Sequence, residues 1–216
     1  MSGTHEPADA RPRRPAARAI RDLLAPVLAA APTLGRTRLV CVDGPAGSGK
    51  TTLAGRLAAV AADIADGPVT QVHMDDLYEG WGGLHRAAFE LVPAWLLAPL
   101  AAGRPGRYRR YDWSAGQYAE WHEVPAAGLL VIEGCGSAAA PVDAHVGLRI
   151  WVEAPPDLRL RRGLERDGPA ARKLWLRWRA DEAAHFAADA TRARADVRVD
   201  GAPMREHDPR TEVVLA

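Results

Sequence analysis

One short segment limits the fold of this chain more than any other: GPAGSGKT, Gly44 to Thr51. It fits the pattern G-x-x-x-x-G-K-[ST] at every fixed position. An apolar, β-branched run that ends in glycine, residues 37–44, precedes it and predicts a buried strand. A helix is expected directly after it, from about residue 49 to 65, because Asp66 and Gly67 then supply turn chemistry. A strand, a glycine-rich loop and a helix in this order predict a cradle for phosphate groups.

Each part of this loop has a chemical task. Its glycines allow unusual backbone dihedral angles, so that successive N–H groups can point at phosphate oxygens, and the following helix adds its positive N-terminal end. Lys50 is expected to reach the β- and γ-phosphates of ATP as a mobile point charge, and the Thr51 hydroxyl is expected to bind Mg²⁺. Lys50 is one of only two lysines, with Lys173, among 28 Lys and Arg residues, so its place in the loop is not a by-product of composition. The predicted ATP-binding residues are Gly44, Pro45, Ala46, Gly47, Ser48, Gly49, Lys50, Thr51 and Thr52.

Further apolar runs and helical patterns extend the same architecture. The other predicted strands cover residues 69–74, 128–134, 147–153 and 195–201. The other predicted helices cover residues 17–31, with an interruption near Pro26, 91–102, 156–166 and 173–194. Short apolar strands separated by helices predict an α/β fold, a P-loop NTPase three-layer sandwich with a predominantly parallel five-stranded sheet. Ligands of such sheets bind beyond the carboxyl ends of the strands, so the residues that follow each strand are candidates for the site.

Composition bounds the class of protein. A length of 216 residues suits one domain with a small lid, and we expect a disordered lead over residues 1–16, the domain over 17–204 and a tail over 205–216. The net charge of +1 gives no global field that favours nucleic acid or a membrane. Neither a membrane span nor a secretory signal is visible. Cys41 and Cys135 fit neither a disulfide framework nor a zinc site. We therefore expect a cytoplasmic protein without a nucleic-acid or membrane partner, and its oligomeric state stays open.

Missing signatures separate the classes of protein that share this loop. The chain contains no asparagine, so the guanine-reading N-K-x-D signature of GTPases cannot exist. It contains no L-S-G-G-Q signature of transporter ATPases, and its length leaves no room for the additional lid domain of AAA proteins. These absences favour a small-molecule kinase.

The chain resembles the uridine kinase/phosphoribulokinase group of P-loop kinases. The matching segments occur in the order of that group: VDGPAGSGKTTLA (42–54), DDLY (75–78), RYDW (110–113), VIEG (131–134), WVEAPPDLRLRRGLERD (151–167) and ADVRVDG (195–201). This colinearity, spread over about residues 37–201, is more specific than any one motif. The resemblance implies a transfer of phosphate from ATP to an alcohol with Mg²⁺. It also implies an acceptor-binding insertion at about 75–123 and an arginine-bearing lid at about 160–173.

The resemblance also implies catalytic roles. Asp75 corresponds to the general base, since a carboxylate near the triphosphate can accept the proton that an attacking hydroxyl loses, and its neighbour Asp76 stays open as an alternative. Glu133 would hold Mg²⁺ with Thr51, or would orient the attacking group. With Lys50, the lid arginines Arg162 and Arg166 would stabilise the transferring phosphoryl group. The two arginines are four residues apart and share a helix face, although solvated positions are equally compatible with a chain so rich in arginine.

The implied acceptor site is less complete. Its matching residues are Tyr78, Tyr111 and Asp112, with His122 and several tryptophans, among them Trp81, Trp113 and Trp121, in the same insertion. Aromatic side chains there could stack against a base or pack in the core. The chain departs from uridine kinases because the histidine position of the group falls near Gly116, and EGWGGL (79–84) stands where the group has an acidic sugar-binding segment. A nucleoside such as uridine is the leading acceptor. Pantothenate, a sugar, a nucleoside monophosphate, or a binding module with slow ATPase activity remain alternatives.

Overall fold

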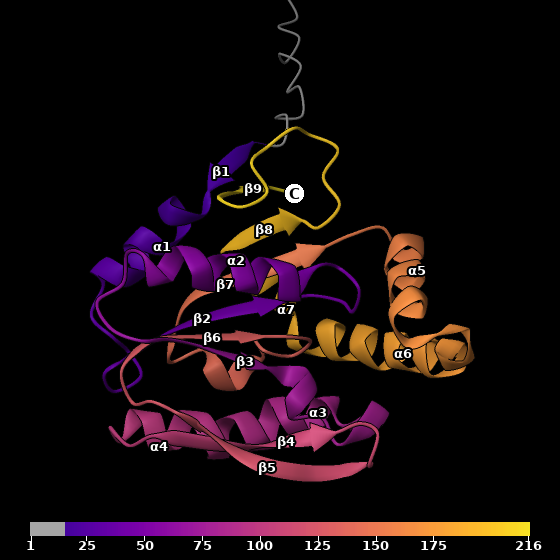
Figure 1. Cartoon of the computed structure of the whole chain (residues 1–216), viewed down its shortest axis with the longest axis horizontal. Helices are drawn as coiled ribbons and strands as arrows, with labels where there is room; N and C mark the ends of the chain where they lie inside the picture. The colour runs from indigo at the N-terminus through magenta and orange to yellow at the C-terminus, as the bar shows by residue number, and fades with distance from the viewer. Residues whose placement is uncertain (1–15) are drawn as a thin grey trace, which may run out of the picture.

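The computed structural model describes residues 16–216; of the lead expected over residues 1–16, residues 1–15 lie outside the described residues. Within residues 16–216, five parallel strands form the main sheet in the order β3-β6-β2-β7-β8 (Figure 1). The strands are β2 Thr37–Asp43, β3 Val69–His73, β6 Gly128–Glu133, β7 Val146–Glu153 and β8 Val197–Asp200. Each lies within two residues of its predicted position. The predicted α/β sandwich around a five-stranded sheet is confirmed, and the main sheet is parallel throughout.

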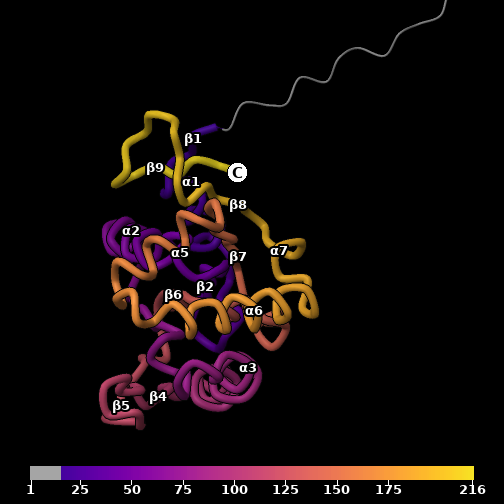
Figure 2. The backbone as a smooth tube through the Cα atoms, turned by 90° about the vertical axis from the view of Figure 1, so that its right-hand side faces the viewer, coloured from indigo at the N-terminus to yellow at the C-terminus, as the bar shows by residue number. Residues whose placement is uncertain are grey.

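Helices cover both faces of this sheet (Figures 1 and 2). One face packs against α1, Ile20–Ala29, and α2, Lys50–Ala62. The other face packs against the helical segment of residues 84–101 and against α6, Arg172–Asp189. Side chains of β2 alternate between the two cores: Val40 and Val42 are buried on the side of α1 and α2, and Leu39 and Cys41 are buried on the other.

The remaining helices differ in detail from the expected ones. A continuous segment comprises α3, Leu84–Arg86, a π-helix, Ala87–Leu97, and α4, Ala98–Ala101. It begins seven residues before the predicted helix because apolar residues such as Ala87 and Ala88 continue its buried face. The predicted helix of residues 173–194 is divided at Ala190, whose φ of 52° is left-handed, into α6 and α7, Thr191–Arg194. α5 covers Pro156–Asp167, and short 3-10 turns cover Met74–Asp76, Gly80–Gly82, Ala140–Val142 and Pro169–Ala171.

Two antiparallel pairs were not predicted. The insertion holds a hairpin of β4, Gly106–Asp112, and β5, Gln117–Val124. The second pair joins β1, Ala17–Ala19, to β9, Glu212–Val214, so the segment expected as a tail contributes a strand. Three-residue strands carry too few positions for the apolar alternation that identifies a strand. The hairpin was missed because both of its faces carry charged and aromatic side chains.

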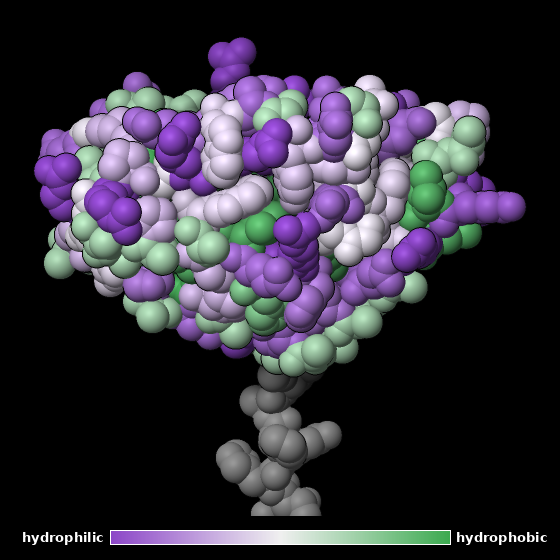
Figure 3. Space-filling view, turned by 90° about the horizontal axis from the view of Figure 1, so that it is seen from below, coloured by the Kyte–Doolittle hydropathy of each residue, from purple (hydrophilic) through white to green (hydrophobic). Residues whose placement is uncertain are grey.

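The surface is mixed in character. Seen from below, hydrophilic and hydrophobic side chains alternate over the molecule, in keeping with the small net charge (Figure 3). Among residues 16–216, no helix has both the length and the apolar composition needed to cross a membrane.

Candidate active site

The phosphate loop lies between β2 and α2 at the carboxyl edge of the sheet. Gly44 and Gly47 have φ angles of 138° and 77°, in the region that favours glycine. A Cβ atom would lie 2.2 Å from the Val152 carbonyl oxygen at Gly44, and 2.5 Å from the Arg159 carbonyl oxygen at Gly47. Gly44 and Gly47 are therefore required both by their backbone angles and by the close approach of neighbouring main chains.

Asp43 stabilises the start of this loop through hydrogen bonds. Its buried carboxylate accepts hydrogen bonds from the N–H groups of Gly44 (2.6 Å), Gly136 (3.0 Å) and Ala138 (2.8 Å). Burial raises the pKa of Asp43 to about 6, against the opposing effect of these N–H groups and of Lys50. The residue thus joins the end of β2 to the segment after β6, as a structural support for the loop.

Lys50 projects from the first turn of α2 into the same region. Its Nζ donates to the Pro45 carbonyl oxygen at 3.0 Å and lies 3.7 Å from the Cys135 sulfur. Burial by itself would lower the pKa of Lys50, but Cys135, Glu133 and Glu182 outweigh burial and raise it. The ammonium group of Lys50 is therefore charged, as binding to phosphate oxygens requires.

Thr51 and Glu133 form the candidate metal site. Strand register aligns His73 of β3 with Glu133 of β6, beside the start of the phosphate loop. The Thr51 hydroxyl donates to Glu133 Oε1 at 3.0 Å, and His73 Nδ1 lies 2.7 Å from the same oxygen. The hydrogen bond to Glu133 raises the pKa of His73, although burial opposes it. A hydroxyl and a carboxylate fit Mg²⁺, which prefers oxygen ligands and takes the rest of its shell from phosphates and water.

The neighbouring carboxylates Asp75 and Asp76 face different surroundings. Asp75 lines the cavity, its side chain is 59% exposed, and its Oδ2 lies 4.0 Å from a guanidinium nitrogen of Arg166. Desolvation by the surrounding protein, with repulsion from Glu133, raises the pKa of Asp75. Asp76 instead faces the hairpin, where burial and a hydrogen bond to Asp76 raise the pKa of Tyr108 to about 12.

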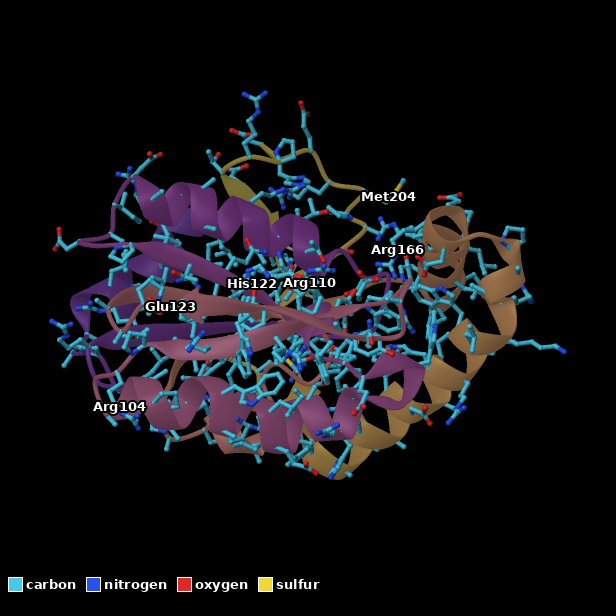
Figure 4. All side chains as sticks on the ribbon, turned by 60° about the horizontal axis from the view of Figure 1, so that its bottom comes forward. Arg104, Arg110, His122, Glu123, Arg166 and Met204 are labelled. Carbon is cyan, nitrogen blue, oxygen red and sulfur yellow. The ribbon has the colours of Figure 1, made fainter. Side chains whose placement is uncertain are left out.

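The predicted lid arginines have different partners. Arg162 donates to the carbonyl oxygens of Gly47 at 3.1 Å and Gly201 at 3.2 Å, so it ties α5 to the phosphate loop and to the end of β8. Arg166 pairs with Asp167 at 2.7 Å, remains 63% exposed, and lies beside the loop that carries Met204 (Figure 4). Both arginines line the cavity.

Glu182 contacts the loop in a way that no sequence pattern indicated. This α6 carboxylate is 3% exposed, and its Oε2 accepts the Ala46 N–H at 2.8 Å while its Oε1 pairs with Arg159 at 3.1 Å. A single glutamate in the middle of a helix has no local signature. Only the crossing of α6 over the loop reveals its position.

A cavity of about 1240 Å³ joins these groups. Part of its lining comes from the segment after β8, including Gly201, Ala202 and His207, and from Val213 and Val214 of β9. The phosphate loop, Glu133 and Asp75 also line it. Another part of the lining is an aromatic wall, which consists of Trp81, Trp113, Trp175 and Trp178, with Tyr78 beside it.

The structure does not bring all predicted acceptor residues into this cavity. Tyr78 lines it, whereas the lining residues within 16–216 do not include Tyr111, Asp112 or His122. Tyr111 packs edge-on against Trp113, the Asp112 carboxylate accepts N–H groups of the hairpin turn, and His122 stacks on Tyr108. His122 lies on the hairpin, away from Arg166 (Figure 4). These side chains shape the hairpin in this structure, and their role in acceptor binding stays a prediction.

Trp175 and Trp178 were missed as pocket residues. Their spacing of three on α6 puts both on one helix face, which is a signal for a shared buried surface but not for a ligand site. Trp81 and Trp113 were recognised as aromatic residues of the insertion, with stacking and core packing left open.

Comparison with solved structures identifies the fold. A possible uridine kinase from Bacillus stearothermophilus is 21% identical, with a TM-score of 0.60 over 83% of this chain and 96% of that chain. A candidate fructose transport system kinase from Silicibacter sp. TM1040 is 22% identical, with a TM-score of 0.56 over 80% of this chain and 95% of that chain. Neither the family models nor the curated proteins give a match. The chain therefore has the fold of P-loop kinases.

Proposed function

We propose that the protein is an ATP-dependent small-molecule kinase that moves the γ-phosphate of ATP to a hydroxyl group. The observation that carries this proposal is the joint placement, in one cavity, of the phosphate loop, the Thr51–Glu133 pair and the carboxylate of Asp75. A nucleotide-binding module needs the loop, but it has no need of a further carboxylate such as that of Asp75 in the same cavity. The similarity of the fold to two proteins described as kinases supports the same reaction class.

The end of the cavity at the phosphate loop, residues 44–52, is called the donor end, and the part lined by the aromatic wall is called the acceptor end. The donor end would hold ATP mainly through main-chain groups. Loop N–H groups and the start of α2 bind phosphate oxygens, and Lys50 neutralises the β- and γ-phosphates. Mg²⁺ bound near Thr51 and Glu133 would neutralise charge that develops on the phosphates. Arg162 supports this cradle indirectly, because it holds the carbonyl oxygens of Gly47 and Gly201 together.

Asp75 would act as the base. The acceptor oxygen attacks the γ-phosphorus, its proton passes to the Asp75 carboxylate, the bond from the γ-phosphorus to the β–γ bridging oxygen breaks, and ADP leaves with the electron pair. Desolvation by the surrounding protein and repulsion from Glu133 raise the pKa of Asp75, which makes its carboxylate a better proton acceptor than that of an ordinary aspartate. Arg166, whose guanidinium nitrogen lies 4.0 Å from Asp75 Oδ2, would contact the transferring group.

The acceptor is a small molecule, and a nucleoside such as uridine is the leading candidate by resemblance. We place the activity in the cytoplasm and expect neither nucleic acid nor a membrane as partner, given a net charge of +1.

The test is a panel assay of the purified protein with ATP and Mg²⁺. ADP formation is measured without acceptor and with uridine, cytidine, pantothenate, fructose or uridine monophosphate, and phosphorylated products are detected by mass spectrometry. We expect ADP and phosphorylated acceptor to form in equal amounts with at least one compound. Slow ADP formation that no acceptor changes would instead support a binding module with residual ATPase activity.

A further inference from the structure

His73 is a polar side chain of the site to which the proposed reaction gives no role. It is the last residue of β3, and the strand register places it directly beside Glu133, the last residue of β6. Both strands end at the edge of the sheet where the phosphate loop begins after β2. No sequence pattern pointed to His73, because a single histidine at the end of a strand has no signature of its own.

One oxygen of the Glu133 carboxylate is fully engaged. Its Oε1 lies 2.7 Å from His73 Nδ1 and accepts a hydrogen bond from the Thr51 hydroxyl at 3.0 Å. A carboxylate has acceptors only, so the imidazole ring carries a proton on Nδ1 and donates it to the same oxygen. Each carboxylate oxygen offers two lone pairs, and these two donors use both lone pairs of Oε1.

The other oxygen of Glu133 is open to the cavity. Among residues 16–216, no hydrogen-bond donor reaches Oε2, although Glu133 is only 4% exposed. The atom is not sealed inside the protein either, and the side chain lines the cavity, so Oε2 faces the cavity. A carboxylate oxygen that is almost buried and has no donor is suited to a cation, or to a water molecule that a cation holds.

Lys50 is a cation that competes for this oxygen but does not bind it. Glu133 is one of the charges that raise the pKa of Lys50, so the two groups are close enough to attract each other. The ammonium group nevertheless donates to the Pro45 carbonyl oxygen at 3.0 Å, and within residues 16–216 no ion pair joins it to Glu133. The two opposite charges therefore stay apart in the described part of the chain.

We infer that His73 is a positioning residue, whose bond to Oε1 fixes the Glu133 carboxylate so that Oε2 is available to Mg²⁺ and kept from Lys50. This inference rests on the proposed function, which places Mg²⁺ near Thr51 and Glu133. Hydrogen bonds behind a metal ligand orient that ligand, and their loss typically lowers metal affinity by roughly 10- to 100-fold. His73 acts through Glu133 rather than on the substrates, because it is absent from the cavity lining within residues 16–216.

The first experiment measures binding without any phosphate transfer. Calorimetry gives the Kd of the non-hydrolysable β,γ-imido analogue of ATP, once with Mg²⁺ and once with EDTA. The wild-type protein should bind the analogue more tightly with Mg²⁺. His73→Ala should lose most of this gain, roughly 10-fold or more in Kd, and keep the Kd in EDTA within about threefold of the wild-type value. Equal weakening in both conditions, or a wild-type Kd that Mg²⁺ does not change, would overturn the inference.

Two further variants separate positioning from a general structural role. His73→Asn places an amide N–H near the position of Nδ1, so it should restore the Kd with Mg²⁺ to within about threefold of the wild-type value. His145→Ala is the matched control: His145 Nδ1 also makes a hydrogen bond, to the Thr33 carbonyl oxygen at 3.0 Å, but it directly precedes β7, at the amino edge of the sheet. Failure of His73→Asn to restore binding, or an equal loss in His145→Ala, would contradict the inference.

Turnover tests the same residue once an acceptor is known. The free Mg²⁺ concentration for half-maximal activity should rise by roughly 10- to 100-fold in His73→Ala, while kcat at saturating Mg²⁺ stays within about tenfold of the wild-type value. A larger fall of kcat that no Mg²⁺ concentration restores would overturn the positioning role. The binding experiment needs no acceptor, so it supports or overturns the role of His73 even if the panel assay detects no phosphorylated product and the kinase proposal fails.

Discussion

The two ends of the cavity are built in different ways. At the donor end, one continuous segment, residues 44–52, supplies main-chain N–H groups, and buried supports such as Asp43 and Arg162 hold that segment from behind. At the acceptor end, side chains from separate segments form the surface, and the main chain contributes little. Main-chain recognition suits a ligand group common to many proteins. A side-chain surface can change without loss of the loop, so under the proposed function we expect specificity for the acceptor to be set at that end.

The largest expected effect is at the donor end. Lys50→Ala should lower phosphotransfer by roughly 10³-fold or more with the fold intact, because Lys50 supplies the mobile charge on the phosphates. Turnover is measured with ATP and the best acceptor, and circular dichroism and thermal melting report the fold. Lys173→Ala is the matched control, since Lys173 is the second lysine of the chain and lies exposed at the start of α6. A folded Lys50→Ala protein with near-normal turnover would show that the loop does not bind the phosphates of ATP.

The next largest effect is expected at Asp75, the proposed base, which lies between the donor end and the acceptor end. Asp75→Asn should lower kcat by roughly 10² to 10⁴, the usual contribution of a general base, while ATP affinity changes only a few-fold. Asp76→Asn should do much less, because Asp76 faces Tyr108 on the hairpin. Single-turnover kinetics and ATP binding by calorimetry separate these effects. An inactive Asp76→Asn protein beside an active Asp75→Asn protein would move the base by one residue.

The donor end could be predicted from the sequence better than the acceptor end, because one continuous segment forms the first and separate segments form the second. The phosphate loop was predicted residue by residue because its geometry is local: Gly44 and Gly47 permit the turn, and the strand before it and the helix after it are strong patterns. The roles predicted for Asp75 and Glu133 came from the resemblance to the uridine kinase group, and both residues lie at the carboxyl edge of the sheet, where ligands of such folds bind. The place of Trp175 in the cavity could not be predicted, because it depends on how α6 packs against the sheet. That helix lies roughly a hundred residues after Asp75 in the chain, so no local pattern connects the two. His122 was predicted from its segment, but the register of the hairpin turns it toward Tyr108.

Substitution of the two predicted lid arginines should separate an effect on kcat from an effect on ATP binding. Arg166→Ala should lower kcat by roughly 10²-fold if the guanidinium group contacts the transferring phosphoryl group. Arg162→Ala should act mainly on the KM of ATP, because Arg162 donates to Gly47 and Gly201 of the donor end. Arg161→Ala is the control, since its side chain is exposed and pairs only weakly with Glu165. Unchanged kinetics in both Arg162→Ala and Arg166→Ala would place these side chains in structural roles alone.

The pH dependence reports the charge around the base. Only the carboxylate form of Asp75 accepts a proton, so kcat/KM should fall about tenfold per pH unit below its pKa. Because desolvation by the surrounding protein and repulsion from Glu133 raise that pKa, the fall begins at a higher pH than for an ordinary aspartate. Arg166 opposes the shift, so Arg166→Ala should move the fall to still higher pH. The residual activity of Asp75→Asn should not show this fall of kcat/KM at low pH. If the fall persists in that variant, a group other than Asp75 causes it.

The smallest expected effect tests whether the two ends are coupled through α5. Gly163 lies on this helix against Trp175, and a Cβ atom at Gly163 would lie 2.2 Å from an atom of that indole ring. Gly163→Ala should therefore displace Trp175, raise the acceptor KM by roughly 3- to 10-fold and destabilise the protein by about 1–3 kcal/mol through overpacking. The KM of ATP should stay within about twofold, since the phosphate loop is held by other contacts.

Gly55→Ala is the matched control, because Gly55 is also a glycine inside a helix, but a Cβ atom added there meets no atom within 4 Å. That variant should gain about 0.5–1 kcal/mol from helix propensity and leave both KM values unchanged. If Gly163→Ala changes the KM of ATP as much as that of the acceptor, the two ends move as one unit and the contrast between them is structural rather than functional.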